Sequence, residues 1–250
     1  MRNILLTGAI CLATAATAAA QNDFEWTGQL AKGQRIEIRD VNGSIKATAA
    51  PGGNIVVTAV KKAGRRGSPS DVRIETLAHS GGVTVCVIYG DGDCRDGGSR
   101  TNNKQNNDTS VEFTVQVPAG IGLSAHTVNG SIDANGLQSD AEVATVNGQV
   151  TVATNGSARA NTVNGDIKAA MGQAPNGGTF STVNGGITLQ LPAETNANVR
   201  ASTVSGDIQS DFPLQMSTEP GPKNASGVLG AGGQELRVST VNGGIKLARK

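Results

Sequence analysis

The sequence predicts an all-β protein whose chain winds into a single-stranded, β-helix-like β-solenoid, a stack of short coils. Three observations favour this fold. A six-residue pattern around Val-Asn-Gly recurs through the second half of the chain. Apolar and polar residues alternate on both sides of each copy, and residues 110–250 show no helical period. Aromatic residues make up only 2% of the chain, so small aliphatic side chains must fill its core.

The first twenty residues are expected to be a signal peptide and not part of the fold. Arg2 supplies a positive charge, residues 4–12 form a short apolar run, and residues 18–20 offer a small-residue cleavage site. The apolar run is too short to span a bilayer. We therefore expect an exported chain, periplasmic, secreted or at the cell surface, that is not membrane-spanning.

Residues 21–122 are predicted to form an irregular β region at the N-terminal end of the solenoid. The predicted strands span residues 34–40, 54–61, 71–77, 83–89 and 110–117. The polar run 95–108 is expected to be a long mobile loop. Two arrangements remain open: wider coils that continue the stack, or a small cap domain over its open end.

Two cysteines, Cys86 and Cys94, remain after removal of the signal peptide. An even number of cysteines in an exported chain predicts one disulfide between them. A metal or redox pair is the alternative. Two thiols alone make a poor zinc site, and thioredoxin-like chemistry uses Cys-x-x-Cys, so the disulfide is favoured.

Residues 123–250 contain the regular solenoid, with coils of 17–21 residues. Six copies of the pattern begin at Thr127, Thr145, Thr162, Thr182, Thr203 and Thr240, and Asp40 begins an isolated seventh. The last interval is longer because it contains residues 213–233, which are rich in Pro, Gly and Ser. We expect this segment to be an inserted loop outside the stack that supplies no strand.

An antiparallel meander, with each Asn-Gly as a hairpin turn, is the alternative architecture. Identical residues at equivalent positions favour the solenoid, because there they stack about 4.8 Å apart and their amides can bond along the axis. Each Asn is expected to adopt a left-handed or a corner conformation. The predicted structural ladder is Asn42, Asn129, Asn147, Asn164, Asn184, Ser205 and Asn242, with Ser205 between the last two asparagines.

Isolated titratable residues are interpreted as structural. Asp91, Asp93 and Asp96 loosely resemble a calcium loop but lack the further oxygen ligands that calcium needs. His79 and His126 have no Cys or carboxylate pattern near them in the sequence. No metal site and no cofactor are predicted.

Charge and motif content exclude other classes of function. The chain has 21 Lys and Arg against 20 Asp and Glu, which gives no basis for nucleic-acid binding. The basic cluster at residues 61–66 is expected to be a solvated turn. Asp166 and Asp207 are predicted to lie two coils apart, about 10 Å, with Gly186 between them, and nothing marks either as a raised-pKa acid. No catalytic residue is therefore predicted.

On these repeats the chain resembles the bacterial putative-adhesin family of exported β-solenoid proteins, from about Ile36 to Leu247. The isolated Asp40 copy, the Val83–Val87 stretch and the final Thr240 copy carry the resemblance. It implies a domain of unknown function and supplies no catalytic motif. Fold alone does not establish adhesion.

The favoured hypothesis is a non-enzymatic, adhesin-like interaction or scaffold module of the cell envelope, whose partner is an unknown envelope protein or polysaccharide. A carbohydrate-active β-helix enzyme is one alternative, and a periplasmic regulatory partner of a membrane protein is another. A groove with clustered carboxylates and a base would favour the enzyme.

Overall fold

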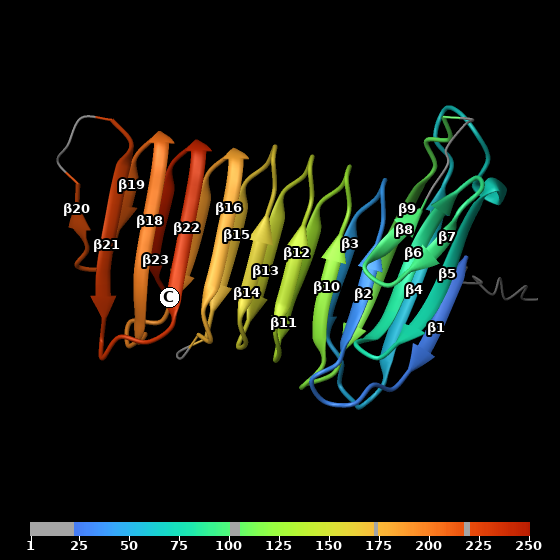
Figure 1. Cartoon of the computed structure of the whole chain (residues 1–250), viewed down its shortest axis with the longest axis horizontal. Coiled ribbons are helices and arrows are strands. Elements are labelled where there is room, and N and C mark those ends of the chain that lie inside the picture. Colours follow the sequence, from blue (N-terminus) through green and yellow to red (C-terminus); the bar gives the residue numbers. More distant parts are fainter. Residues whose placement is uncertain (1–22, 101–105, 173–174, 218–220) are drawn as a thin grey trace, which may run out of the picture.

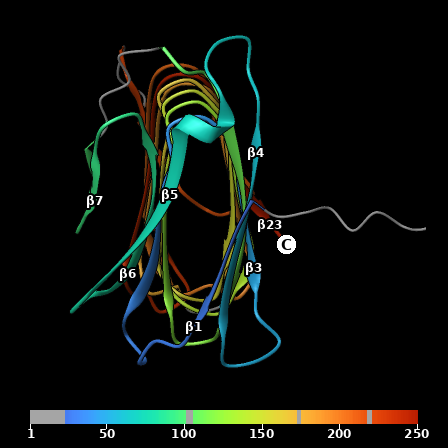
Figure 2. The same cartoon turned by 90° about the vertical axis from the view of Figure 1, so that its right-hand side faces the viewer.

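The computed structural model describes residues 23–100, 106–172, 175–217 and 221–250. Two facing sheets run along the whole molecule and form a flattened β-solenoid (Figures 1 and 2). The predicted fold class is therefore confirmed. The expected signal peptide lies outside the described residues. Within the described part, no helix is long and apolar enough to cross a membrane.

The elements follow from the alternating sequence pattern. The ten strands of the first sheet are, in spatial order, β1 (Phe24–Gly28), β4 (Ile55–Lys62), β9 (Ser110–Val117), β3 (Ile45–Ala49), β11 (Ile132–Leu137), β13 (Val150–Thr154), β15 (Ile167–Met171), β17 (Ile187–Leu191), β23 (Ile245–Arg249) and β19 (Ile208–Ser210). The eleven strands of the second sheet are β20 (Gln215–Met216), β21 (Lys223–Leu229), β18 (Ala197–Ser205), β22 (Glu235–Asn242), β16 (Gly178–Asn184), β14 (Ala158–Asn161), β12 (Ala141–Ala144), β10 (Gly122–His126), β2 (Arg35–Arg39), β6 (Gly82–Tyr89) and β5 (Val72–His79). A separate hairpin pairs β7 (Asp93–Arg95) with β8 (Gly98–Arg100), and Pro69–Asp71 form one 3-10 turn.

Each regular coil gives one strand to each sheet, and the Thr-Val-Asn-Gly segment forms the corner between them. Equivalent residues pair in parallel register, as Ile167 does with Val150 on one side and Ile187 on the other. All three are at most 1% exposed. Facing them, the second sheet contributes small residues such as Val143 and Ala160. The core is thus the aliphatic one that the composition predicts.

The last two coils do not stack in chain order. Asn242 pairs directly with Asn184, and Ser205 pairs with the other side of Asn242. The prediction that Ser205 lies between these two asparagines is therefore wrong. With Asn242 next to Asn184, the two side-chain amides form one more hydrogen bond of the ladder, and a serine in that position has no amide to form it. The serine corner is left at the end of the stack.

The segment 213–233 is more than an exposed loop. Its residues Lys223–Leu229 form β21, which pairs antiparallel with β18, and β20 pairs with β21. The prediction that this segment supplies no ladder strand is wrong. Its antiparallel strand covers the edge of the second sheet that the parallel stack would leave open, as the left end of Figure 1 shows.

The N-terminal region continues both sheets and also covers their other end. β2 pairs with β10 and β3 pairs with β11, so this coil stacks directly on the first regular coil. Strands from the segment that connects β3 to β10, such as β6 and β9, lie beyond β2 and β3, towards the N-terminal end of the stack. The outer strands β4 and β5 then pair antiparallel with β9 and β6. Part of the expected mobile loop is ordered, because β7 and β8 fold over β6 as a hairpin. β6 is consequently buried on both faces.

Candidate functional site

The corner residues bind neighbouring coils to one another. Buried threonines donate their Oγ1 protons to the corner glycine of the adjacent coil, as Thr182 does to the Gly165 carbonyl at 2.9 Å. The asparagine side chains bond amide to amide at 2.8–2.9 Å along the stack. The bonded series is Asn42, Asn129, Asn147, Asn164, Asn184 and Asn242. These groups satisfy one another, so the ladder stabilises the stack.

The corner glycine is required by the closeness of the next backbone. A Cβ on Gly165 would lie 2.0 Å from the Gly148 carbonyl oxygen. Of the two conformations expected for the asparagines, the left-handed one is wrong, because Asn106 is the one non-glycine residue with positive φ in the described part of the chain. The corner is therefore tight because the glycine lacks a side chain, and the Asn backbone is unstrained.

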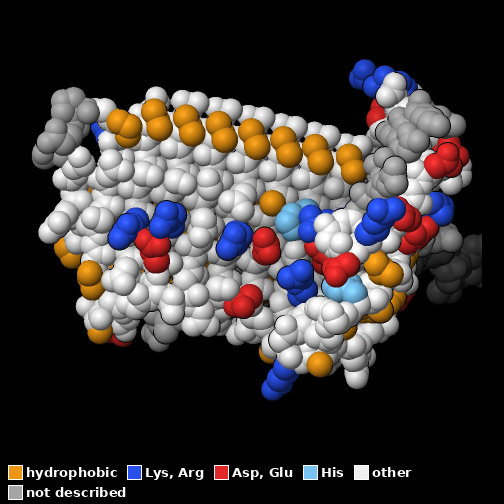
Figure 3. Space-filling view, in the orientation of Figure 1, with side chains coloured by type: hydrophobic (Ala, Val, Ile, Leu, Met, Phe, Trp, Pro, Cys, Tyr) orange, Lys and Arg blue, Asp and Glu red, His pale blue; other side chains and the backbone are white. Residues whose placement is uncertain are grey.

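The corner valines point away from the core and form an exposed row. Val146, Val163 and Val183 are 38–40% exposed. Figure 3 shows the row along the upper edge of the molecule. Alternation along the strand could have predicted it, because a buried Thr places the next residue on the opposite side.

A disulfide-linked hairpin covers a charged cluster at the N-terminal end of the second sheet. Cys86 in β6 and Cys94 in β7 are bonded, with Cα atoms 5.6 Å apart. Beneath the hairpin Glu37 is only 1% exposed, although it lies on the outer face of the sheet. Its carboxylate accepts hydrogen bonds from Arg39 Nε at 2.8 Å and from the Thr84 hydroxyl at 2.7 Å. The hairpin thus covers the carboxylate of an ion pair whose Arg39 side chain stays 26% exposed.

His79 extends this cluster from β5. Its Nδ1 accepts the Gly81 N–H at 3.2 Å, so its Nε2 carries the proton and donates to the Thr84 hydroxyl at 3.1 Å. Thr84 in turn donates to Glu37. Burial raises the pKa of Glu37, but the Thr84 hydrogen bond and the Arg39 guanidinium outweigh it and hold the pKa below its usual value.

Glu37, His79 and Asp96 bring ligand atoms within 4.8 Å of one another, which makes them a geometric candidate for a metal. The sequence around His79 has no carboxylate pattern, and the fold brings Asp96 to 3.5 Å from its Nδ1. The donor set does not suit a cation, because the Arg39 guanidinium already neutralises Glu37 and would repel a metal. Within the described residues, the hydrogen bonds of the cluster join β2, β5 and β6, and the hairpin approaches the cluster through Asp96.

His126 lies on β10 with its Nε2 3.0 Å from the Ser124 hydroxyl. Burial lowers the pKa of His126, and Arg39 lowers it further. A serine nucleophile also needs an oriented base and oxyanion donors. Within the described residues, no hydrogen bond reaches the other ring nitrogen of His126, so this pair lacks the group that would orient it.

The basic cluster at residues 61–66 is tied into the N-terminal cap. Lys62 pairs with Glu112 at 2.6 Å. Asp108 accepts the backbone N–H of Arg66 at 2.8 Å, and this bond is the main reason that the pKa of Asp108 lies below its usual value. The prediction of a solvated turn is wrong for Lys61 and Lys62, which end β4, and only residues 63–66 of the cluster lie outside a strand.

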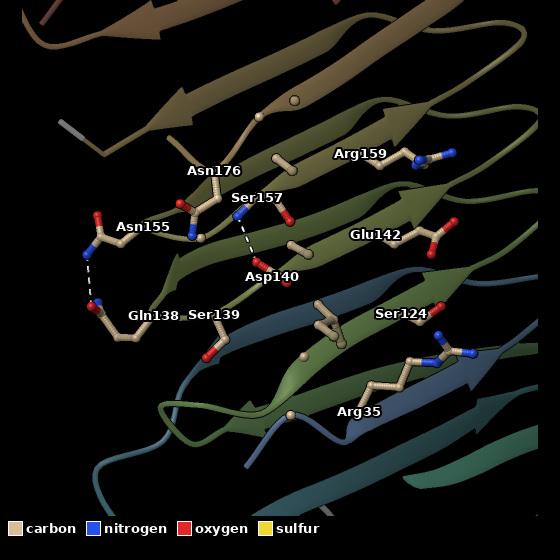
Figure 4. Close-up of a pocket in the computed structure, with 18 of the residues that line it drawn as sticks. Arg35, Ser124, Gln138, Ser139, Asp140, Glu142, Asn155, Ser157, Arg159 and Asn176 are labelled. Carbon is tan, nitrogen blue, oxygen red and sulfur yellow. Dashed lines mark hydrogen bonds between the residues drawn. The ribbon is translucent and has the colours of Figure 1, made fainter. Parts of the chain in front are cut away.

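A polar groove crosses β2, β10, β12, β14 and β16 on the outer face of the second sheet, and its volume is about 750 Å³. The loops at the edge opposite the Thr-Val-Asn-Gly corners form one wall of the groove. There Gln138 accepts a hydrogen bond from Asn155 at 2.8 Å, and Asp140 accepts one from the Ser157 N–H at 2.8 Å (Figure 4). Four steps between strands make it about 19 Å long. The groove was not predicted from the sequence, because its lining residues come from loops and strands outside the repeated motif.

Charged side chains of both signs line the groove. Glu142 and Arg159 occupy equivalent positions on adjacent strands, and Arg35 lies at the N-terminal end. In Figure 4 these side chains and Ser124 point to the same side. The groove therefore offers carboxylate, guanidinium, amide and hydroxyl groups, spaced by one coil.

Asp166 and Asp207 lie three coils apart and not two, because β23 separates β17 from β19. Three steps place their strands about 14 Å apart, beyond the range of roughly 6.5–9.5 Å for an inverting carboxylate pair. Asp166 accepts the Gly186 N–H at 2.7 Å, and Asp207 is paired with Lys223. The two carboxylates do not face each other across a common centre.

The chain is similar to known proteins over most of its length. The Toastrack family, DUF4097, matches residues 35–248. No curated protein matches the chain. One similar solved structure is a putative cell adhesion protein from Clostridium sporogenes, with 10% identity, a TM-score of 0.38 and coverage of 91% of this chain and 99% of that chain. A putative adhesin from Bacteroides fragilis has 14% identity, a TM-score of 0.41 and coverage of 90% and 96%. Because the family match spans most of the sequence, the chain belongs to the Toastrack DUF4097 family.

Proposed function

We propose that this protein is a non-enzymatic, adhesin-like interaction module of the cell envelope that binds an extended polysaccharide along the groove of the second sheet. The observation that carries this proposal is the groove itself, which presents hydrogen-bonding side chains once per coil across five strands. Successive units of a linear polymer can each form hydrogen bonds with the side chains of successive coils. The repeating surface of a solenoid is suited to this kind of ligand.

The lining chemistry supports a glycan over an apolar partner. Arg35, Glu142, Arg159 and Asn155 offer donors and acceptors that match sugar hydroxyl groups. An extended, solvent-open groove without a deep apolar pocket fits a hydrated polymer better than a small hydrophobic ligand.

The carbohydrate-active enzyme is the weaker alternative. The two carboxylates of the groove are those of Asp140, which directly precedes β12, and Glu142, which lies within β12, so they are only two residues apart. Glycoside hydrolysis needs carboxyl groups on opposite sides of the scissile bond. This geometry supports binding without bond cleavage.

An extracellular or envelope location agrees with the Cys86–Cys94 disulfide, because such bonds persist in oxidising compartments. Export remains part of the proposal. Mass spectrometry of the protein from its native host, without reduction, should find the two cysteines bonded. Two free thiols would remove this support.

Binding to immobilised envelope polysaccharides tests the proposal. We expect the double variant Glu142→Gln/Arg159→Gln to lose most of its binding, since both exposed side chains line the groove. Lys46→Gln, on the outer face of the other sheet, is the matched control and should bind normally. Equal binding by both variants, or glycan cleavage by the unaltered protein, would contradict the proposal. Capture of a membrane protein in place of a glycan would favour the regulatory alternative.

A further inference from the structure

A second depression lies on the outer face of the first sheet, close to the corner, and its volume is about 520 Å³. It forms where two neighbouring corners have no side chain after the motif glycine. Those positions are Gly186 and Gly244, which the insertion of β23 beside β17 brings onto adjacent rungs. Other corners carry a side chain there, such as Gln149 and Asp166.

The backbone does not require glycine at either position. A Cβ on Gly244 would approach no atom closer than 3.5 Å, and one on Gly186 would meet the Gly244 carbonyl oxygen at 3.3 Å. By contrast, a Cβ on the preceding Gly243 would lie 2.0 Å from the Gly185 carbonyl oxygen. The depression thus arises from missing side chains that the fold could accommodate.

Two lysines face this depression from strands that flank Thr188. Lys168 pairs with Thr188 on one side, and Lys246 pairs with it on the other. Two strand steps separate the lysines by about 10 Å. Both are exposed, and neither has an ion-pair partner within the described residues.

The carboxylates at the two ends of the depression already have partners. Asp166 accepts the Gly186 N–H at 2.7 Å, and Asp207 is paired with Lys223. Two lysines and two aspartates line the depression. Lys223, which lies outside the lining, neutralises Asp207, so the two lysines are opposed by the single carboxylate of Asp166. Thr188 and Gln209 add uncharged hydrogen-bonding groups.

We propose that this depression is a second binding site, distinct from the groove, that takes a carboxylated sugar unit of an acidic polysaccharide. The flat glycine floor admits a sugar ring. The carboxylate of the sugar lies between Lys168 and Lys246, and its hydroxyl groups bond to Thr188 and Gln209. The site lies on the opposite sheet from the groove, so it does not depend on binding there.

Calorimetric titration of the full chain with trigalacturonate tests the site, with maltotriose as the neutral probe and inorganic phosphate as a competitor. We expect trigalacturonate to bind, maltotriose to fail and phosphate not to displace the uronate. Lys168→Gln/Lys246→Gln should weaken binding roughly tenfold or more, because it removes both ammonium groups. Lys46→Gln should have no effect, because Lys46 occupies the equivalent strand position in another coil and lies outside the depression.

Gly244→Gln is the second test, because it fills the depression without changing its charge. Gln149 occupies the equivalent position in another coil, so the variant should keep its melting temperature and lose trigalacturonate binding. Unchanged binding in Gly244→Gln or in the double lysine variant would overturn the proposal. Binding of maltotriose with equal affinity, or displacement of the uronate by phosphate, would also overturn it.

Discussion

The central corners of the stack differ from the two terminal corners by one residue each. Central corners carry Thr, Val, Asn and Gly, and each has a matching corner on both sides. The first corner has Asp40 in place of Thr, and the last has Ser205 in place of Asn. Both exceptions lie where a regular neighbour is missing on one side. The residue type at each corner position therefore depends more on contacts with the adjacent coil than on contacts within the same coil.

Asp40 illustrates what the threonine contributes. In regular corners the threonine hydroxyl bonds to the same carbonyl oxygen that the corner glycine approaches. At Gly43 the approached oxygen belongs to Val111, 1.9 Å from an ideal Cβ. An ionised aspartate cannot donate to that oxygen, and Asp40 Oδ2 has no hydrogen bond within the described residues. Burial raises the pKa of Asp40 to about 7.

The largest effect is expected from Gly165→Ala in a central corner. The new Cβ would meet the Gly148 carbonyl oxygen, and coils on both sides prevent the backbone from moving away. We expect a loss on the order of 3–5 kcal/mol in the free energy of unfolding, measured by denaturant titration. Gly244→Ala is the control and should cost little. An equal loss in both variants would refute the close-approach argument.

Asp40→Thr should stabilise the protein at neutral and alkaline pH. Because the folded-state pKa is raised, the native chain binds the proton more tightly, and stability falls as pH rises from about 4 through 7. The threonine does not titrate, so we expect a gain on the order of 3 kcal/mol at pH 8 and little difference near pH 4. Unfolding titrations at both pH values measure this. A gain that is independent of pH would show that the charge of Asp40 is not its cause.

Asn164→Val should cost about 1–2 kcal/mol, because Asn164 bonds to asparagines on both sides. Asn242→Val should cost about half as much, since Asn242 donates to Asn184 and has only Ser205 on its other side. The unstrained Asn backbone removes conformational strain as a cause. Thermal unfolding of the two variants compares them, and an equal or reversed order would contradict the ladder argument.

The smallest effect is expected from Ser205→Asn, which extends the ladder by one rung. The new amide would donate to Oδ1 of Asn242, which accepts no hydrogen bond within the described residues, and should add roughly 0.5–1 kcal/mol at this exposed edge. Thermal unfolding should show a slightly higher Tm. A lower Tm would mean that the terminal corner differs from the central ones in its backbone as well as in its side chain.

Much of the regular stack could be predicted from local patterns. The alternation around Ile167 and Ile187 predicts strands with one buried face, and the shared corner residues predict parallel stacking. The pairing of Cys86 with Cys94 followed from their number and proximity. The groove and the covered Glu37 cluster could not be predicted, because they join loops and strands with no shared motif.

By itself, the sequence determined that this chain forms a solenoid with Thr buried, Val exposed and Gly at the closest backbone contact, because each of these choices repeats with every coil. Only the tertiary structure decided which copies are neighbours. The Thr203 and Thr240 copies have nearly the same pattern, so local chemistry fits either of them beside the Thr182 copy. Interactions between residues far apart in the chain favour the observed order. They are the side-chain hydrogen bond between Asn242 and Asn184, and the antiparallel pairing of β21 with the outer edge of β18.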